Sequence, residues 1–239
     1  MSGHSKWAQI KRQKGVADAR RGTLYTKLAN LISAAVREGG KDPKMNFRLR
    51  LLIDKARSVN MPSTTVDRAI KRGAGELPGG TIERVTYECY GPDGIACIVE
   101  AVTDNTNRTT SELRHLLSRY AGRLGSSGSV LWMFEAKGRV EIPNSPLSEE
   151  IELSLIDAGM ADSVVSTNRR LLYTDPENLE KLKTGAEQNK LTVSDSEIVY
   201  VPKQETLVTP EDREQFHTFL DELDALDDIT NVTTNAAEV

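Results

Sequence analysis

The sequence predicts an α+β, multidomain protein, with an N-terminal three-helix domain followed by two ferredoxin-like α/β domains, one inserted in the other. Hydrophobic residues recur at helical spacing in the first third of the chain, and segments typical of strands and helices alternate in the rest. The 239 residues accommodate three small domains, and an aromatic content of 5% favours several small cores. The expected boundaries are 1–78, 79–136 together with 204–239, and 137–203 for the inserted domain.

The first domain is predicted to consist of three helices. Apolar residues follow a helical period over residues 23–38, and two glycines end this segment. A second amphipathic segment covers residues 47–59. The third helix is expected over residues 64–72, because Thr64-x-x-Asp67 has the form of a capping box that opens a helix.

A hairpin is predicted after the helical domain. Two segments rich in β-branched residues, 85–90 and 95–103, flank the turn sequence GPDG. With a four-residue loop, Cys89 would face Ala96, and Cys97 would lie on the opposite side of the sheet. We therefore expect no disulfide between these two cysteines, which agrees with a reducing cytosol.

The remaining segments form two nested βαββαβ patterns, the order of a ferredoxin-like domain. The inner pattern is complete between residues 139 and 201. The outer pattern, which the inner one interrupts, consists of strand 95–103, a helix over 110–121 opened by Thr109-x-x-Glu112, strand 129–134, strand 206–208, helix 210–226 and strand 229–233. This nesting predicts that the inner domain is inserted into the central hairpin of the outer one.

The sequence lacks the patterns that most enzymes and metal sites require. His4, His115 and His217 lie in different segments, and the two cysteines form no Cys-x-x-Cys motif. The Gly/Ser-rich segment 122–130 lacks the Gly-Lys-Ser/Thr end of a phosphate-binding loop. No apolar stretch reaches the roughly 18 residues of a membrane-spanning helix, and the N-terminus lacks the apolar segment of a secretory signal. We therefore expect a cytoplasmic, non-enzymatic protein without cofactor or metal.

Charge is distributed unevenly along the chain. Residues 1–75 contain 17 Lys and Arg but only five Asp and Glu, a net charge of +12, whereas the rest of the chain carries −16. Such a division favours a basic module that binds a polyanion, joined to a body that does not. Six to ten phosphate contacts change affinity by roughly 10³–10⁵ over a modest salt range, and the basic module holds enough cations for this.

The candidate nucleic-acid contacts lie on the basic N-terminal arm and the helices that follow it. Arg68, Lys71 and Arg72 share the outer face of the third predicted helix at i, i+3 and i+4. Trp7 has two alternative roles, stacking on an unpaired base or packing into a core. The candidates are Lys6, Trp7, Lys11, Arg12, Lys14, Arg20, Arg21, Lys27, Arg68, Lys71 and Arg72.

Four long motifs follow one another along the chain: SGHSKWAQIKRQKGVADARRGTLYTKL, DKARSVNMPSTTVDRAIKRGAG, YGPDGIACIVEAVTDNTNRT and GRLGSSGSVLWMFEAKG. Together they closely resemble the YebC/PmpR family, and the resemblance extends along essentially the whole chain. The resemblance implies an N-terminal helical domain and two α/β domains. It also implies nucleic-acid contacts for the HSKW arm, for the basic helix 64–72, and for the DNTNR loop 104–108 with Arg108 and neighbouring Arg114.

The resemblance leaves two functions open. Family members are described as DNA-binding transcriptional regulators or as translation factors that act on the ribosome where proline-rich nascent chains stall. The expected partner is therefore duplex DNA or ribosomal RNA, with the ribosome as a candidate. A monomer is favoured, because no dimerisation stripe is evident. The acidic helix 210–226 is expected to be a solubilising surface, with docking on the basic module or on a basic partner as alternatives.

Overall fold

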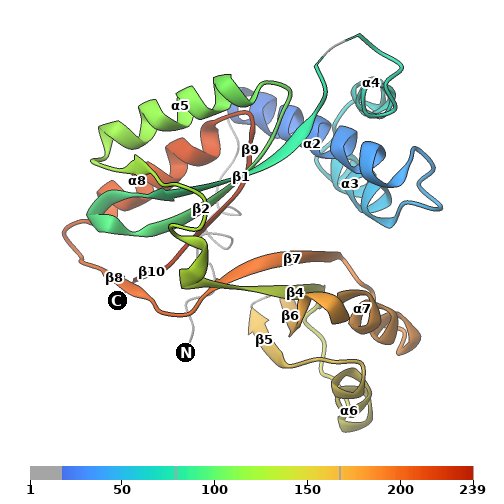
Figure 1. The fold of residues 1–239 in the computed structure, drawn as a ribbon. Helices are drawn as coiled ribbons and strands as arrows, with labels where there is room; N and C mark the ends of the chain where they lie inside the picture. Colours follow the sequence, from blue (N-terminus) through green and yellow to red (C-terminus); the bar gives the residue numbers. More distant parts are fainter. Residues whose placement is uncertain (1–17, 79, 167, 239) are drawn as a thin grey trace. The chain divides into compact units, whose positions relative to one another are not determined.

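The computed structural model describes residues 18–78, 80–166 and 168–238. The chain divides into two compact units. One comprises the chain up to Met133 together with the part from Pro202 onward, and the other comprises Phe134–Val201. Helices combine with largely antiparallel sheets in an α+β, multidomain arrangement, which confirms the predicted fold class (Figure 1). Within the described residues, no helix has both the length and the apolar composition needed to cross a membrane.

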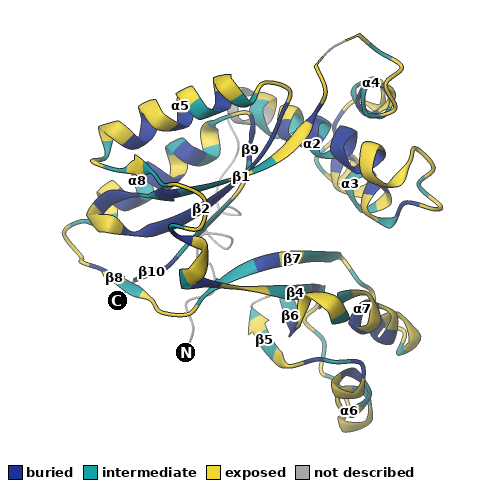
Figure 2. Ribbon diagram, in the orientation of Figure 1, coloured by how far each residue is buried: buried dark blue, intermediate teal, exposed yellow. Residues whose placement is uncertain are grey.

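Three helices open the first unit: α2 (Asp18–Gly39), α3 (Phe47–Ser58) and α4 (Ser63–Gly73). They enclose a small core that includes Leu28, Ile32 and Leu49, and Figure 2 shows buried residues alternating with exposed ones along these helices. The three predicted helical segments are therefore confirmed. The predicted capping box is wrong: α4 starts at Ser63, and its N-cap residue, Pro62, makes no side-chain cap.

The first unit also contains a four-stranded sheet in the order β3-β1-β2-β9. Its strands are β1 (Glu83–Tyr90), β2 (Ala96–Thr103), β3 (Arg123–Leu124) and β9 (Ile229–Thr234). Two helices, α5 (Thr106–Arg119) and α8 (Arg213–Ala225), pack around a core that includes Val99, Leu113 and Phe219. Val102 contacts Ala34 of α2 instead. Because Val99 and Val102 point to opposite faces of the sheet, the helical segment packs on the face that α5 and α8 leave open.

The strands of this unit differ from the predicted outer pattern. Residues 129–134 are not one strand, because they contain the 3₁₀ turn η2 (Leu131–Met133) and end at the first residue of a strand of the other unit. The predicted strand 206–208 exists as β8 (Thr206–Val208), but it pairs in parallel with β10 (Ala236–Glu238) in a separate sheet. The place beside β2 belongs to β1, because a hairpin closes a far shorter loop than pairing with β8 would.

The β1–β2 hairpin has a different register from the expected one. Cys89 lies opposite Cys97, because the connection contains the 3₁₀ turn η1 (Pro92–Gly94) and is one residue longer than expected. Asp93 adopts a positive φ of 54° within this turn. Both cysteines are fully buried and free, and their side chains lie on the same face of the hairpin.

Helix α5 starts earlier than the predicted cap at Thr109. Its N-cap is Asn105, whose side-chain oxygen accepts a hydrogen bond from the backbone N–H of Arg108 at 3.0 Å. Most of the segment predicted as the DNTNR loop is therefore the cap and first turn of a helix. Thr109 lies within this helix and is buried.

The second unit has the βαββαβ order of a ferredoxin-like domain. Its elements are β4 (Phe134–Pro143), α6 (Glu149–Asp157), β5 (Asp162–Ser166), β6 (Arg169–Thr174), α7 (Leu179–Gln188) and β7 (Asp195–Pro202). The sheet order β5-β6-β4-β7 places the first and third strands of the pattern at its centre. Residues of the sheet and of both helices, among them Ile142, Leu155 and Leu182, form the core.

Candidate nucleic-acid interface

The outer face of α4 carries two exposed cations. Val66 and Ala69 are buried in the core of the helical segment, which leaves Arg68 and Lys71 on the exposed side. Neither forms an ion pair with another described residue, although Glu76 is an electrostatic neighbour of Lys71. These two side chains are therefore predicted contacts that the structure leaves available to an anion.

Close packing fixes the position of α4 against α2. The hydroxyl of Ser33 donates a hydrogen bond to the carbonyl of Ala69 at 2.8 Å in a buried position. At Gly73, an added Cβ would lie well inside contact distance of the Ser33 carbonyl oxygen and 2.8 Å from the Cβ of Val36. Glycine is therefore required at this helix crossing, and the crossing holds the exposed cations in a defined orientation.

Exposed cations outside the candidate set lie on α3 and in the loop before it. Lys44 and Lys55 are exposed, and neither has an ion-pair partner in the described part of the chain. Arg57 of the same helix is instead paired with Asp54 at 3.0 Å. The only sequence signal for Lys44 and Lys55 was the net charge of the segment, which cannot distinguish a paired cation from an unpaired one.

Lys27 is not part of the exposed basic surface. Its side chain is only 10% exposed, and its ammonium group donates hydrogen bonds to the backbone carbonyl and to the carboxylate of Asp224, the latter at 3.0 Å. An ammonium group held by a carboxylate in a buried position is poorly placed to bind a phosphate. We therefore leave Lys27 out of the proposed interface. Because Asp224 belongs to α8, the acidic helix docks on the basic helix α2 at this point.

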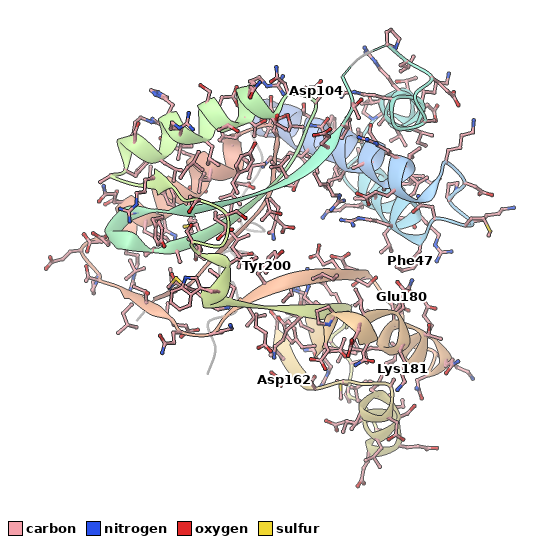
Figure 3. The ribbon with its side chains drawn as sticks, in the orientation of Figure 1. Phe47, Asp104, Asp162, Glu180, Lys181 and Tyr200 are labelled. Atoms are coloured by element: carbon pink, nitrogen blue, oxygen red, sulfur yellow. The ribbon has the colours of Figure 1, made fainter. Side chains whose placement is uncertain are left out.

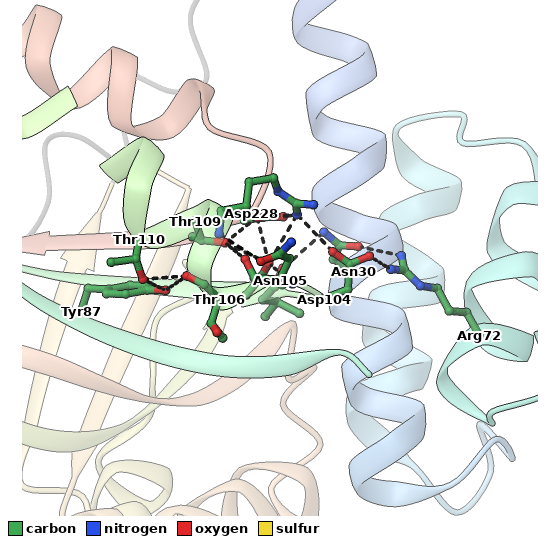
Figure 4. A network of polar contacts seen from close by, with 12 residues as sticks. Asn30, Arg72, Tyr87, Asp104, Asn105, Thr106, Thr109, Thr110 and Asp228 are labelled. Carbon is green, nitrogen blue, oxygen red and sulfur yellow. Dashed lines mark hydrogen bonds and ion pairs between the residues drawn. The ribbon is translucent and has the colours of Figure 1, made fainter. Parts of the chain in front are cut away.

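Arg72 bridges α4 and the end of β2. Its guanidinium donates to the carboxylate of Asp104 at 2.5 Å and to the side-chain oxygen of Asn30 at 3.4 Å. Asn30 in turn donates to the carbonyl of Val102 at 3.3 Å. Figure 3 locates Asp104 just before α5, and Figure 4 shows the network. Sequence spacing places Arg72 on the outer face of α4 with Arg68 and Lys71, but its half-buried guanidinium is paired with the carboxylate of Asp104, which follows β2.

Arg108 belongs to the same network and is held by two carboxylates. It donates to Asp104 at 3.1 Å and to the two oxygens of Asp228 at 2.8 and 3.1 Å. The hydroxyls of Thr103 and Thr109 also donate to Asp228, at 2.9 and 2.6 Å, and the Asp228 side chain is only 6% exposed. Hydrogen bonding to Asp228 raises the pKa of Arg108 above its ordinary value. The geometry therefore gives Arg108 an internal role that the sequence did not indicate.

The remaining candidates fall in two groups. Arg114 is exposed on α5 and forms no ion pair with another described residue. The residues of the N-terminal arm lie outside the described part of the chain. Arg20 and Arg21 belong to the first turn of α2, of which the structure describes only the backbone. The candidates of the arm are Lys6, Trp7, Lys11, Arg12 and Lys14.

Within the described residues, no group of three or more His, Cys, Asp or Glu side chains is arranged to hold a metal ion. The network around Asp228 contains two carboxylates, but both accept hydrogen bonds from arginines. The contacts of this network join α4 and α5 to the ends of β2 and β9.

Comparison with known proteins finds matches over nearly the whole chain. Residues 5–76 match the family model "TACO1/YebC protein N-terminal domain", and residues 82–236 match "TACO1/YebC second and third domain". A probable transcriptional regulatory protein of Thermoanaerobacter pseudethanolicus is 44% identical over 237 residues, which cover 98% of this chain and 96% of that protein. A probable transcriptional regulatory protein of Chlorobaculum tepidum is 45% identical over 238 residues, 98% of this chain and 94% of that one.

A solved structure has the same fold. The crystal structure of a conserved hypothetical protein from Aquifex aeolicus superimposes with a TM-score of 0.83 at 40% sequence identity. The match covers 98% of each chain.

Proposed function

Because the chain belongs to the TACO1/YebC family, whose relatives are named probable transcriptional regulatory proteins, we propose that it is a non-catalytic, nucleic-acid-binding regulator of gene expression. Its basic helical segment holds the phosphate backbone. The rest of the chain carries a net charge of −16, so we expect it to contact the polyanion only where cations are locally exposed.

The observation that supports this proposal best is the outer face of α4. Arg68 and Lys71 are exposed there without a described ion-pair partner, on a helix that Gly73 fixes against its neighbour. Each phosphate that such a cation neutralises releases condensed counterions, so binding gains free energy that decreases as salt increases. Lys44 and Lys55 add charge, and we propose that the N-terminal arm adds further contacts.

The relatives' names favour duplex DNA as the target, and ribosomal RNA is the alternative. The position of Arg72 favours the alternative, because only two of the three cations predicted for the outer face of α4 remain available. Two exposed cations suit contacts to phosphates, whereas base readout in the major groove needs several side chains that reach base edges. A factor that recognises shaped RNA through its backbone needs no such set.

Salt titration of binding tests the proposed interface. The double variant Arg68→Glu/Lys71→Glu is compared with the wild type on duplex DNA and on structured RNA. Each lost phosphate contact lowers the slope of log affinity against log salt by about 1. Lys190→Glu, an exposed charge reversal in the second unit, is the matched control and should leave the slope unchanged. Equal slopes for the double variant and the wild type would remove α4 from the interface.

Crosslinking followed by sequencing of the bound nucleic acid separates the two targets. Discrete peaks at promoters would support the transcriptional role. Recovery of ribosomal RNA without promoter enrichment would support the translational one.

A further inference from the structure

The turn η2 presents an exposed tryptophan that the proposed function does not use. The side chain of Trp132 is 67% exposed, and neighbouring Leu131 is 38% exposed. A single exposed apolar residue is ordinary on a protein surface. Trp132 differs because the loop that carries it is held in place and because aromatic and cationic side chains lie next to it.

Glu88 of β1 holds the loop before Trp132. Its carboxylate accepts hydrogen bonds from the backbone N–H groups of Gly128, Val130 and Leu131 at 2.6, 2.6 and 2.7 Å. The loop closes further through the N–H of Gly125, which donates to the carbonyl of Glu88 at 2.8 Å. Four hydrogen bonds to one strand residue fix the loop, so little conformational entropy remains to be lost when a ligand binds to it.

The indole ring is anchored at its edge. Its Nε1–H donates to the carbonyl of Ser129 at 3.0 Å, and the hydroxyl of Tyr90 donates to the same carbonyl at 2.8 Å. No aromatic ring or guanidinium of the described residues stacks on Trp132. The polar edge of the ring is therefore satisfied, and its large apolar surface remains in contact with solvent.

Two cations flank this aromatic pair. The guanidinium carbon of Arg123 lies 4.8 Å from the centre of the Tyr90 ring. The ammonium group of Lys203 donates to the carbonyl of Trp132 at 2.9 Å, and both cationic side chains are exposed. The carboxylate of Glu88, which holds this loop, is already bound to three N–H groups, so its charge is partly compensated.

We propose that Trp132 stacks on an unpaired nucleobase of a bound strand, with Lys203 and Arg123 facing the adjacent phosphates. An exposed aromatic ring beside cations is the arrangement that single-strand-binding proteins use, because every base has a face that can stack. The proposal deepens the proposed function by adding a second contact in the first unit, far in sequence from α4. It rests on nucleic acid being the partner.

The size of the surface favours a base over a protein partner. A stable protein–protein interface buries about 1,200–2,000 Å² in total, whereas one large aromatic side chain supplies only about 150–250 Å². An indole is well matched to one base in area. The flanking cations suit phosphates and are unfavourable next to an apolar partner.

Fluorescence of Trp132 provides the test. The chain contains two tryptophans, so all variants are made in a Trp7→Phe background that leaves Trp132 as the only indole. The probes are an unstructured RNA strand of about 12 nucleotides, the same DNA strand, and a blunt duplex of that sequence. We expect both single strands to quench the fluorescence and the blunt duplex, which offers no unpaired base, to leave it unchanged.

Substitution measures the contribution of the ring. Trp132→Ala should weaken single-strand binding by about fivefold to about 150-fold, and Trp132→Phe should retain most of the affinity because it keeps an aromatic face. Leu207→Ala is the matched control, because Leu207 is an apolar residue of the same unit with a similar exposure of 68%. It should bind single strands as the parent does.

Two outcomes would overturn the proposal. One is unchanged fluorescence at saturating single strand, together with equal affinities of Trp132→Ala and its parent. The other is a Trp132→Ala variant that binds strands normally but loses self-association in sedimentation, which would make this surface a contact between copies. The Arg68→Glu/Lys71→Glu variant separates the two proposals. If single strands still quench Trp132 in this variant while its salt slope equals that of the wild type, only the α4 interface is rejected.

Discussion

The guanidinium of Arg108 lies 2.8 Å from the carboxylate of Asp228, which is 120 residues further along the chain. This contact joins the first turn of α5 to the residue that precedes β9. Asp104 accepts from Arg108 and also from Arg72, so the same network joins the sheet to α4 (Figure 4). The segment 104–108, for which the family resemblance implies nucleic-acid contacts, therefore has a structural role.

Replacing Arg108 should destabilise the first unit. Arg108→Ala leaves the buried carboxylate of Asp228 with only the hydroxyls of Thr103 and Thr109 as side-chain donors. Because Arg108 is 45% exposed, we expect a moderate loss of about 1–2 kcal/mol in the free energy of unfolding, measured in urea at neutral pH. Arg114→Ala, an exposed change on the same helix, should stay within about 0.5 kcal/mol of the wild type. An unchanged unfolding midpoint for Arg108→Ala would contradict the internal role.

Substitution of Arg72 should change stability without changing nucleic-acid binding, and substitution of Arg68 should do the reverse. Arg72→Ala breaks the contacts to Asp104 and Asn30 and should lower the free energy of unfolding by about 1 kcal/mol, while the salt slope of nucleic-acid binding stays the same. Arg68→Ala should have the opposite effect, with unchanged stability and a slope lower by about 1. Calorimetry and salt titration on the same two samples make the comparison. A lower slope for Arg72→Ala would return Arg72 to the interface.

The helices of the first unit could be predicted because hydrophobic spacing is a local property. The β1–β2 hairpin could also be predicted, because its turn is local, although its register could not. The pairing of β8 with β10 could not be predicted, because the sequence pattern assigned residues 206–208 to the outer sheet and only the three-dimensional arrangement decides between these places. Both capping boxes failed for a related reason. Thr64 and Thr109 fit the pattern, but the chain before each of them was already helical, starting after Pro62 and Asn105.

The sequence predicted which part of the chain is basic, but it did not predict which of the basic side chains are exposed and which are paired. Net charge placed the basic surface on the first third of the chain. It could not reveal that Lys27 pairs with Asp224, because 197 residues separate them. Trp132 was overlooked because nothing in the sequence around it distinguishes an exposed aromatic residue from a core residue.

The loop that carries Trp132 should lose stability in acid. Burial opposes ionisation of Glu88, but hydrogen bonds from three backbone N–H groups outweigh it, so the pKa of Glu88 lies below its ordinary value of 4.5. A carboxyl group with a lowered pKa in the folded state contributes stability above its unfolded pKa, and this contribution disappears as the pH falls through the folded pKa. We therefore expect the free energy of unfolding to decrease as the pH falls below about 4.5.

Glu88→Gln tests this linkage. The amide cannot accept from all three N–H groups, so at pH 7 the variant should lose about 1–3 kcal/mol. The free energy of unfolding of the variant should also change less with pH in the acid range than that of the wild type. Urea unfolding at several pH values gives both results, and parallel pH profiles for variant and wild type would contradict the role of Glu88. Glu135→Gln, an exposed change close in sequence to Trp132, is the control.

The paired cysteines should resist modification until the unit unfolds. Cys89 and Cys97 are both fully buried, and hydrogen bonding to Cys89, together with burial, raises the pKa of Cys97 well above 9.0. Only the thiolate reacts readily, so a disulfide reagent at pH 8 should label neither cysteine in the native protein. The labelling rate should increase with urea in parallel with unfolding. Rapid labelling of one cysteine without urea would contradict the burial of both thiols.

Two glycine substitutions should change stability in opposite directions. Gly73→Ala places a methyl group against the Ser33 carbonyl and the Cβ of Val36, so α4 must move away from α2. We expect a loss of about 1–3 kcal/mol in the free energy of unfolding, and weaker nucleic-acid binding because Arg68 and Lys71 move with the helix. Gly22→Ala lies within α2, and no atom of the described residues lies near the added methyl group, so it should gain about 0.5–1 kcal/mol. Thermal unfolding and duplex titration of both variants measure these effects. A Gly73→Ala protein as stable as the wild type would show that α4 is not held by close packing, and the fixed orientation of its exposed cations would no longer be supported.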